Sequence, residues 1–322
     1  MEARASVCVV GSVNTDILAA LERFPAAGET IAAKGFKVSG GGKGANQAVA
    51  LAKLGTETRF VAKLGSDAFG RDRLADLFAA GIEVSTIGIE EGADSGIALV
   101  ETDMSGQNRI VIVAGANALV DESFVESRAA SIASASMALF QLEIPLSAVS
   151  KGLAIAQKGG ALTMLDPAPA QALPPGIYPL LDYLTPNETE TEILTGIPPR
   201  DAESAAAAAV CLLKRGARNV IIKAGKQGAY LFSSGLPARF CPAFPVQAVD
   251  STAAGDAFNA GFAAALASGK SEAEALRFSC AVGALATTRR GAQEAMPTLA
   301  EVESLLRAHP EIQTRIICVE AG

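Results

Sequence analysis

A short stretch between residues 250 and 261 combines a turn of small residues with a carboxylate at the start of an apolar helix. The turn is Ala253-Ala254-Gly255, and Asp256 follows it directly. Because the turn has no bulky side chain, its N–H groups can approach an anion, and the positive end of the helix adds to the attraction. A carboxylate would repel that anion, so Asp256 makes sense there mainly as a base that deprotonates an attacking hydroxyl. A lone Asp at a helix start is more often an N-cap, so both interpretations stay open.

A second glycine-rich segment, Gly40-Gly41-Gly42-Lys43-Gly44, opens a helix predicted over 44–54. It is not a Walker A loop, because neither Ser nor Thr follows Lys43. The loose Rossmann pattern G-x-G-x-x-A is satisfied over 40–45, but no buried apolar strand precedes it. The third interpretation is a polyol site, in which Lys43 and Asn46 supply polar groups and the glycines let a small ligand touch the backbone. The plainest alternative is a glycine-rich turn with a solvated lysine.

Polar residues also follow the first predicted strand, Val7–Val10. Asn14 and Asp16 alternate with Thr15, so on an extended segment they point the same way. An amide beside a carboxylate suits the vicinal hydroxyls of a sugar, and ligands of open α/β sheets bind just past the strand ends. Glu143 follows another predicted strand and could add a third polar contact, although a lone Glu there is more often an ordinary loop residue.

The elements that must position these residues alternate between short β-branched runs and helical patterns. We predict strands at Val7–Val10, Thr58–Ala62, Met137–Gln141, Ala161–Leu165, Tyr183–Thr185 and Val220–Lys223. We predict helices at Gly44–Leu54, Gly70–Ala80, Leu146–Lys158, Thr189–Thr195, Ala202–Arg215, Gly255–Ser268, Ser271–Thr288 and Leu299–Ala308. This alternation indicates βαβ units, and therefore an α/β fold with a mostly parallel sheet covered by helices.

Two stretches, 13–39 and 95–114, break this rhythm and look extended. The second predicts a hairpin around Ser105-Gly106. The economical interpretation is a small β-sheet built from both insertions and placed over one edge of the body as a lid. One face of such a sheet would expose apolar residues, so we expect two lids to pair in a homodimer.

The composition is that of a compact enzyme-sized domain, since the 322 residues are 50% apolar and 19% charged. The net charge is −7 with no long basic run, so neither a nucleic-acid nor a membrane partner is expected. The five cysteines are scattered, which favours a reducing compartment over disulfides or zinc, and the only histidine, His309, argues against His-dependent triads. No secretion signal or membrane-spanning run is recognisable, so we expect a cytoplasmic protein.

As a set, these residues resemble the ribokinase branch of the PfkB carbohydrate kinase family. The resemblance runs from the first strand to about Pro297, and the order and spacing of its motifs are highly specific together. The segments that carry it are Gly11–Asp16, Gly41–Ala48, Ala114–Ala118, Asp166–Pro169, Thr185–Glu190, Asp250–Asp256 and Thr288–Gln293.

This resemblance implies a fold and a reaction. The fold is a three-layer α/β/α body with a mostly parallel sheet and a small β-sheet lid, as one domain over 1–312 with a C-terminal tail over 313–322. The reaction is ATP-dependent phosphorylation of the 5-hydroxyl of D-ribose, with Asp256 as the general base. The turn Ala253-Ala254-Gly255 would form the anion hole, chiefly through the amides of Ala254 and Gly255. The residues implied to hold the sugar are Asn14, Asp16, Gly42, Lys43, Asn46 and Glu143.

The resemblance also implies where the nucleotide and the cations bind. Asn187 and Glu190 occupy positions linked to phosphate and, through water, to Mg²⁺, which would bridge phosphate oxygens rather than sit in an all-protein cage. Lys223 opens the nucleotide loop, and it either contacts ATP phosphates or faces solvent. Cys280 matches a variable adenine-contact position, its alternative being a buried helix cysteine. The loop is Lys223, Ala224, Gly225, Lys226, Gln227 and Gly228. A monovalent cation, usually K⁺, is implied at Asp250, Thr252, Ala286, Arg289, Gly291 and Ala295.

One position of the implied cation site departs from the family pattern. Ala295 stands where some relatives have a serine hydroxyl, so one side-chain ligand for the cation is missing. We therefore expect a cation site whose affinity differs from that of those relatives.

Three alternatives remain at this point. Within the kinase class the acceptor could be 2-deoxyribose, fructose, adenosine or pseudouridine. Asn14 favours ribose, because an amide left without the 2-hydroxyl partner would penalise the deoxy sugar. From other classes, a non-catalytic sugar sensor and an NAD(P)-dependent oxidoreductase are possible.

Overall fold

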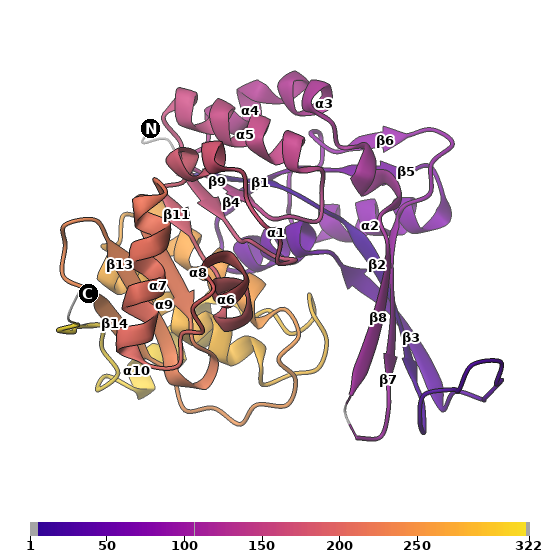
Figure 1. Cartoon of the computed structure of the whole chain (residues 1–322). Helices are drawn as coiled ribbons and strands as arrows, with labels where there is room; N and C mark the ends of the chain where they lie inside the picture. Colours follow the sequence, from indigo (N-terminus) through magenta and orange to yellow (C-terminus); the bar gives the residue numbers. More distant parts are fainter. Residues whose placement is uncertain (1–5, 106, 320–322) are drawn as a thin grey trace.

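The computed structural model of the chain describes residues 6–105 and 107–319. Its body is a nine-stranded sheet with the order β15-β14-β13-β12-β11-β10-β9-β1-β4 (Figure 1). The strands from β12 to β4 in that order are parallel, whereas β13, β14 and β15 are antiparallel at one edge. The strands are β1 (Ser6–Val10), β4 (Glu57–Val61), β9 (Met137–Phe140), β10 (Leu162–Leu165), β11 (Tyr183–Leu184), β12 (Asn219–Lys223), β13 (Gly228–Ser233), β14 (Arg239–Pro242) and β15 (Arg315–Ile316).

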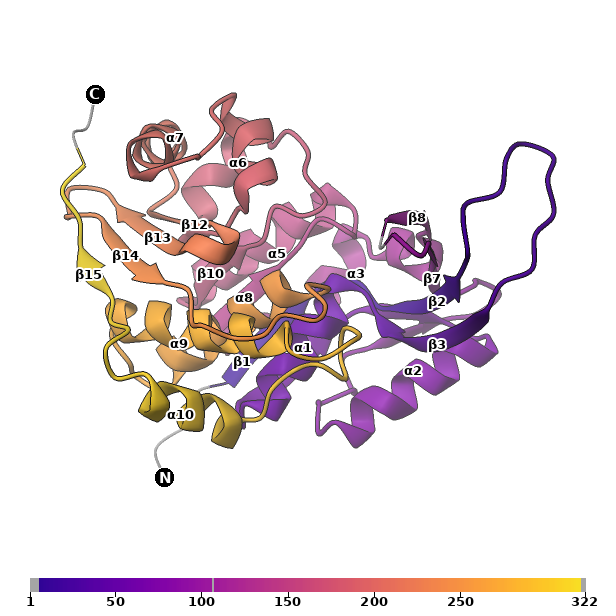
Figure 2. The same ribbon diagram turned by 90° about the horizontal axis from the view of Figure 1, so that it is seen from below.

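Two hydrophobic layers pack helices against opposite faces of this sheet. Strand β1 shows why: Val7 and Val9 belong to one layer, and Cys8 and Val10 belong to the other, as alternation along a strand requires. One layer includes side chains of α1 (Lys43–Lys53), α2 (Ala68–Ala79), α8 (Ala254–Ala267), α9 (Glu272–Ala286) and α10 (Leu299–Ala308). The other includes side chains of α3 (Glu122–Ser127), α4 (Ala129–Ala133), α5 (Leu146–Gly159), α6 (Glu188–Thr195) and α7 (Ala202–Lys214). The body is therefore a three-layer α/β/α structure (Figure 2).

A separate four-stranded sheet extends from the body beside α1 and α2, and we call it the lid (Figures 1 and 2). Its strand order is β3-β2-β7-β8, with β2 and β7 parallel and the outer pairs antiparallel. The strands are β2 (Asn14–Ala20), β3 (Gly35–Gly41), β7 (Gly96–Thr102) and β8 (Asn108–Val113). Ile110, Val111, Ile112 and Val113 are 49–60% exposed, so the outer strand presents apolar side chains to solvent.

The predicted architecture is confirmed, including the small sheet formed by the two inserted segments. The hairpin prediction is confirmed for β7 and β8, while Gly106 at its turn lies outside the described residues. The antiparallel edge was missed, because β14 and β15 are only four and two residues long. The short helices α3 and α4 were missed for the same reason, since five or six residues show no clear helical period.

Part of the expected C-terminal tail joins the main sheet. Arg315 and Ile316 form β15, which pairs antiparallel with Phe240 and Arg239 of β14. The last three residues of the chain lie outside the described part.

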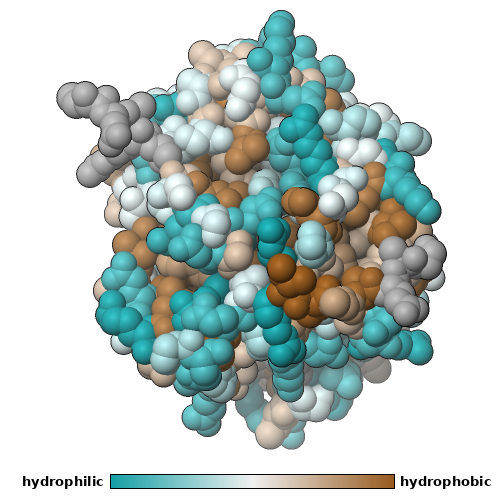
Figure 3. All heavy atoms as spheres, turned by 90° about the vertical axis from the view of Figure 1, so that its left-hand side faces the viewer, coloured by the Kyte–Doolittle hydropathy of each residue, from teal (hydrophilic) through white to brown (hydrophobic). Residues whose placement is uncertain are grey.

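The remaining elements are a small parallel sheet and short 3₁₀ helices. A two-stranded sheet joins β5 (Lys63–Gly65) and β6 (Gly88–Glu90) in parallel. Three short 3₁₀ helices occur at η1 (Gly115–Leu119), η2 (Pro175–Leu180) and η3 (Gly225–Gln227). The face turned away from the lid mixes hydrophilic and apolar residues (Figure 3). Within residues 6–105 and 107–319, no helix has the length and apolar character that a membrane crossing requires.

Candidate active site

The side chains predicted to do chemistry meet at the carboxyl ends of the parallel strands. Glu143 follows β9, Asp166 follows β10, and Lys223 is the last residue of β12. The starts of α1 and α8 lie beside these strand ends, since the N–H of Lys43 donates to Glu143 and Nε2 of Gln47 donates to both Asp166 and Asp256. This is the edge at which open α/β sheets bind ligands.

Asp256 is the third residue of α8 and does not cap it. The N-cap is Ala253, whose φ of +57° makes it the one non-glycine residue with a positive φ among those described. No side chain caps this helix end. The alternative that Asp256 is merely an N-cap is therefore wrong, and its carboxylate is free to face α1.

The carboxylate of Asp256 is buried, with 4% of the residue exposed. Its Oδ2 accepts a hydrogen bond from Nδ2 of Asn46 (3.0 Å), and its Oδ1 accepts one from Nε2 of Gln47 (3.2 Å). Burial raises the pKa of Asp256 to about 6; the positive charge of Lys43 opposes this shift and the negative charge of Asp166 adds to it. A carboxyl group with such a pKa is ionised at neutral pH and can still accept a proton, as a general base must.

The turn before Asp256 is shaped to approach an anion. The left-handed backbone at Ala253 leads into the helix, and α8 leaves the amides of its first turn without intrahelical partners. The N–H of Ala254 donates to the carbonyl of Ser251 at 3.2 Å, so this predicted donor is already engaged. A Cβ on Gly255 would lie 3.5 Å from Nζ of Lys223, which places an ammonium group beside the turn.

Asn14 and Asp16 lie on β2 at the base of the lid. Oδ1 of Asn14 accepts a hydrogen bond from Nδ2 of Asn117 (2.7 Å), so the NH₂ end of Asn14 is left for a ligand. The Asp16 carboxylate lies against the backbone of Gly41, where a Cβ would come within 2.0 Å of Oδ1. Burial, followed by the negative charge of Glu143, raises the pKa of Asp16 to about 6.

Glu143 ties the first turn of α1 to the segment after β1. Its Oε2 accepts hydrogen bonds from Oγ of Ser12 (2.5 Å) and from the N–H of Lys43 (3.0 Å). It is therefore part of the polar cluster rather than an ordinary loop residue.

The glycine-rich turn before α1 packs backbone against backbone. Gly42 has φ +86°, and a Cβ there would lie 2.7 Å from the backbone nitrogen of Asn14. A Cβ on Gly44 would lie 2.6 Å from the nitrogen of Ser12. This segment follows lid strand β3 rather than a buried strand of the main sheet, which removes the context that a Rossmann site requires.

Lys43 supplies positive charge to a cluster that is otherwise acidic. Burial alone would lower its pKa, but the carboxylates of Asp256, Asp166 and Glu143 raise it above the ordinary lysine value. Lys43 therefore stays protonated throughout the neutral range, and the alternative of a merely solvated lysine is wrong.

Three buried side chains of this site were not assigned roles from the sequence: Gln47, Gln141 and Asp166. Nε2 of Gln47 donates to Asp166 (3.3 Å) as well as to Asp256, and Nε2 of Gln141 donates to Oε1 of Gln47 (2.7 Å). Nζ of Lys223 completes the network with a 2.9 Å ion pair to Asp166. The available signal was position, because Asp166 directly follows a predicted strand and Gln141 ends another.

The groups predicted for the nucleotide lie next to Lys223, with which Asn187 forms an isolated parallel bridge. Asn187 and Glu190 form a capping box at the start of α6, in which each side chain accepts a hydrogen bond from the other residue's N–H. Glu190 is 7% exposed; burial raises its pKa, whereas the nearby charge of Lys223 lowers it. The capping role therefore does not remove Glu190 from the polar cluster.

The predicted nucleotide loop is a turn after β12, whereas Cys280 lies in a hydrophobic layer. The loop turns through η3, with Gly225 at φ +49° and Gly228 at φ +126°. Ala224, Lys226 and Gln227 lie within this turn. Cys280 is 7% exposed and packs in the hydrophobic layer with its thiol 3.9 Å from the carbonyl oxygen of Cys241.

The residues predicted to surround a monovalent cation partly converge. Asp250 accepts hydrogen bonds from the N–H groups of Thr252 (2.9 Å) and Gly291 (3.0 Å), which lower its pKa although burial opposes this, so it is ionised. Ala286 ends α9 immediately before Thr287, whose carbonyl accepts from the N–H of Asp250.

The other two residues of the predicted cation site offer only backbone atoms. The Arg289 side chain pairs with Glu301, and Ala295 is buried with a side chain that carries no donor. Carboxylate and carbonyl oxygens are a donor set that suits a hard cation. Within the described ranges, no cluster of three or more His, Cys, Asp or Glu side chains could hold a metal by itself.

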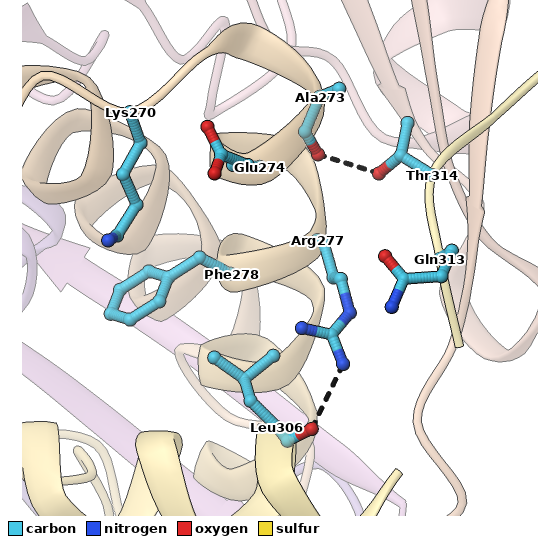
Figure 4. Close-up of a pocket in the computed structure, with 8 residues that line it drawn as sticks. All are labelled: Lys270, Ala273, Glu274, Arg277, Phe278, Leu306, Gln313 and Thr314. Atoms are coloured by element: carbon cyan, nitrogen blue, oxygen red, sulfur yellow. Dashed lines mark hydrogen bonds between the residues drawn. The ribbon is translucent and has the colours of Figure 1, made fainter. Parts of the chain in front are cut away.

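A cavity of about 290 Å³ lies elsewhere, between α9, α10 and residues 313–314 (Figure 4). Arg277 points into it and donates to the carbonyl of Leu306, while the Thr314 hydroxyl donates to the carbonyl of Ala273. Lys270 on its rim follows the C-terminal end of α8, which runs about 16 Å from Asp256 to Ala267 at 1.5 Å per residue. This cavity is therefore separate from the polar cluster.

Comparison with known proteins shows the family to which the chain belongs. Residues 4–299 match the model of the pfkB family of carbohydrate kinases. The chain is 40% identical to the ribokinase of Haemophilus influenzae over 303 residues, which cover 94% of this chain and 99% of that protein. It is 32% identical to the deoxyribokinase of Salmonella typhi over 301 residues, which cover 93% of this chain and 98% of that protein.

The fold agrees with a solved structure as well. The structure of Arabidopsis thaliana ribokinase complexed with ribose and ATP superposes with a TM-score of 0.91 at 36% identity. The match covers 95% of this chain and 99% of that one.

Proposed function

The chain belongs to the pfkB family of carbohydrate kinases and is a phosphotransferase of the ribokinase type, and from that premise we propose that it transfers the γ-phosphoryl group of ATP to the 5-hydroxyl of D-ribose. The observation that carries the proposal is the position and burial of Asp256. A buried carboxylate with a pKa of about 6 stands at the start of a helix whose first turn can receive an anion. This pairing of a base with an anion site is what transfer of a phosphoryl group to a hydroxyl requires.

Asp256 removes the proton from the 5-hydroxyl as the oxygen attacks the γ-phosphorus in line, and the bond from that phosphorus to the bridging oxygen breaks so that ADP leaves. The amides of Ala254 and Gly255 receive the negative charge on the transferring group, the Ala254 N–H exchanging the Ser251 carbonyl for a phosphate oxygen. The Ala253 turn holds both amides in place, and Lys223 adds positive charge beside them. Positioning and electrostatics therefore supply most of the rate enhancement.

The sugar lies between the lid and α1. The NH₂ group of Asn14 and the carboxylate of Asp16 bind ring hydroxyls from the lid, and the backbone around Gly42 approaches the ring closely. Lys43, Asn46 and Glu143 bind from the body. Oδ1 of Asn46 supports this arrangement, because it is buried and has no hydrogen-bond partner within the described structure, so a hydroxyl donor would satisfy it.

The nucleotide binds along the loop Lys223–Gly228, with Cys280 beside the adenine and Asn187 at the phosphates. Glu190 would hold Mg²⁺ through water, and the side-chain oxygens of Asn187 and Glu190 suit that cation. A Mg²⁺ ion held there would supply positive charge that offsets the negative charge of the phosphates.

We propose K⁺ beside the anion hole, held by Asp250 and by backbone oxygens of Thr252, Ala286, Arg289, Gly291 and Ala295. The ionised Asp250 and its contacts to Thr252 and Gly291 support this placement. When bound, the cation adds positive charge near the turn that receives the phosphoryl group. Because Ala295 lacks a hydroxyl, the site has one fewer side-chain ligand than a serine there would give.

The Asp256→Asn variant tests the assignment of the base. Since a well-placed general base contributes about 10²- to 10⁴-fold, kcat should fall by about 10³ while the ribose Kd stays within about threefold. The matched control is Asp121→Asn, at the N-cap of α3, where Asn serves as well as Asp. A kcat near that of the unmodified protein for Asp256→Asn would refute the assignment.

A second acceptor, 2-deoxyribose, is favoured by the similarity to the Salmonella typhi deoxyribokinase. Asn14 distinguishes the two sugars, because its NH₂ group would lose a partner if the 2-hydroxyl were absent. We therefore expect a higher kcat/KM for ribose, and we expect Asn14→Ala to reduce the preference.

We further propose that two chains pair through their lids in the cytoplasm and that residues 1–312 act as one domain. The exposed apolar side chains of β8 support the pairing, since a monomer rarely leaves such a strip uncovered. The free thiols of all five cysteines are consistent with a reducing compartment.

A further inference from the structure

Two buried glutamines form a chain of amides that ends on Asp256. Gln141, at the end of β9, donates from Nε2 to Oε1 of Gln47 on α1 at 2.7 Å. Gln47 then donates from Nε2 to Oδ1 of Asp256 at 3.2 Å and to Oδ2 of Asp166 at 3.3 Å. All four residues are buried, with 0–4% exposed.

The two carboxylates fix the direction of both amides. If the Gln47 amide were reversed, its oxygen would face two carboxylate oxygens and no donor. Its NH₂ group must therefore point at Asp256 and Asp166, which leaves its Oε1 toward β9. Gln141 must then present its own NH₂ group, because a second oxygen would repel the first.

This arrangement leaves one atom of Gln141 unsatisfied. Its Oε1 is buried without a hydrogen-bond partner within the described structure and lies where a Cβ on Gly11 would come within 2.0 Å. A buried acceptor without a partner destabilises a protein, so an apolar side chain of the same length would suit the fold at least as well. The stability of the fold therefore does not account for a glutamine at this position.

We propose that Gln141 and Gln47 are positioning residues: Gln141 locks the Gln47 amide, which holds the general base Asp256 in its ionised form and aims its second oxygen at the acceptor hydroxyl. The inference rests on the proposed role of Asp256. Gln47 binds Oδ1 of Asp256. Oδ2, which accepts a hydrogen bond from Asn46, is then the oxygen left to receive the proton of the acceptor hydroxyl. The same NH₂ group fixes Asp166, and Asp166 in turn fixes Lys223.

The charged groups around Asp256 come from several elements, so the effect of one amide must be separated from theirs. Lys43 faces it from α1 and favours its ionised form. Asp166 faces it from the end of β10 and disfavours that form, and Asp16 of the lid interacts with it in the same sense. The test therefore changes only uncharged residues.

Replacement of either glutamine by methionine keeps length and volume and removes the amide. In protein labelled with ¹³C at the aspartate side-chain carboxyl carbon, the titrating signal lost in Asp256→Asn reports the pKa of Asp256 directly. We expect Gln47→Met to raise that pKa by about one unit, because a hydrogen bond to the charged form is lost. Gln141→Met should raise it by a smaller amount, and the double variant should match Gln47→Met alone because Gln141 acts only through Gln47.

Kinetics give a second readout that a merely structural role would not move. Gln141→Met should lower kcat about 3- to 30-fold with KM for the sugar within about twofold, while its Tm is not lower than that of the unmodified protein. An unchanged Asp256 pKa in Gln141→Met, or effects that add in the double variant, would overturn the proposal. A lower Tm with an unchanged kcat would do the same.

The carboxyl titration does not depend on turnover. A protein that fails to phosphorylate ribose would refute the proposed function while the titration still decides the role of the glutamines. If a variant does not fold, the unmodified protein provides the test: the side-chain ¹⁵N signal of Gln47 should titrate with the midpoint of Asp256. A Gln47 signal that does not move with pH would overturn the proposal.

Discussion

Burial decides the acid–base behaviour of the individual residues in this site. Asp256 and Asp16 each have a pKa raised to about 6, in both cases first by loss of hydration. Lys43 is shifted in the opposite sense to its burial, because several carboxylates surround it. The site therefore holds a permanent cation, Lys43, and two carboxyl groups, Asp16 and Asp256, that take up protons just below neutral pH.

The first prediction concerns pH. Above pH about 6 both Asp16 and Asp256 are ionised, and below it each takes up a proton while Lys43 stays charged. Because kcat/KM reports groups of the free enzyme, log kcat/KM for the sugar should fall with a slope approaching about two below that pH. In Asp16→Asn the slope should drop to about one. A profile that stays flat from pH 8 to pH 5 would contradict the role of Asp256.

The second prediction concerns Lys223, whose side chain is 11% exposed and paired with Asp166 at 4%. Lys223→Met leaves a buried carboxylate without its cation, which should lower the free energy of unfolding by about 3 kcal/mol. The double variant Lys223→Met/Asp166→Asn should recover most of that loss in urea unfolding, yet should not recover kcat. If Lys223→Met were as stable as the unmodified protein, the ion pair would not be contributing.

How far the sequence predicts single residues depends on whether their partners are near in the chain. The small turn before Asp256 is visible locally, as is the alternation of Asn14 and Asp16. Gln47 and Gln141 meet only because α1 packs against the end of β9, across 94 positions. Lys223 could be assigned to phosphate or to solvent from the sequence, whereas the fold buries it against Asp166.

At the scale of elements, α1 joins the proposed sugar site to the hydrophobic core, and it begins after a glycine-rich turn. Its first five residues include Lys43, Asn46 and Gln47, and it ends at Lys53, with Leu54 as the C-cap before Gly55. Lys53 donates to the carbonyls of Gln293 and Met296, so the helix also holds the loop beside the predicted cation site. Substitutions at the two ends of α1 therefore test how tightly the helix packs against its neighbours.

The third prediction compares those two ends. Gly42→Ala combines a left-handed φ of +86° with a Cβ 2.7 Å from the Asn14 nitrogen, and should cost about 2–4 kcal/mol of unfolding free energy. Gly55→Ala has nearly the same φ, +79°, but open space, and should cost only about 1 kcal/mol. Sugar affinity should fall at least about tenfold in Gly42→Ala alone, because only that position adjoins Asn14. Urea unfolding and calorimetric titration with ribose measure both effects, and equal stability losses would contradict the packing described.

The same scale shows why most helices were predicted and the sheet edge was not. The helices α6, α7, α9 and α10 begin with capping boxes, whose residue types are visible in sequence. Strands β13 and β14 follow β12 without intervening α-helices and β15 has only two residues, so the βαβ rhythm does not reveal this antiparallel edge. The lid was predicted because its strands lie in two long extended segments that interrupt the alternation of strands and helices.

At the scale of the whole molecule, a single chain does not explain why the outer strand of the lid exposes apolar side chains. The fourth prediction is that the protein has the mass of two chains in sedimentation and that Val111→Asp, on β8, dissociates it. The control is Ile316→Asp on β15, which is 66% exposed against 60% for Val111 and belongs to the main sheet. Dissociation by Ile316→Asp instead, or a monomeric unmodified protein, would contradict pairing through the lid.

The most direct test of the whole account is ADP release with Mg-ATP and K⁺ across ribose, 2-deoxyribose, fructose, adenosine and pseudouridine. We expect ribose to have the highest kcat/KM, by at least about tenfold, because Asn14 and Asp16 are proposed to bind its hydroxyls. The product should be ribose 5-phosphate. No turnover with any acceptor, although ribose raises the Tm, would contradict the account and indicate a sugar-binding protein that does not catalyse phosphoryl transfer.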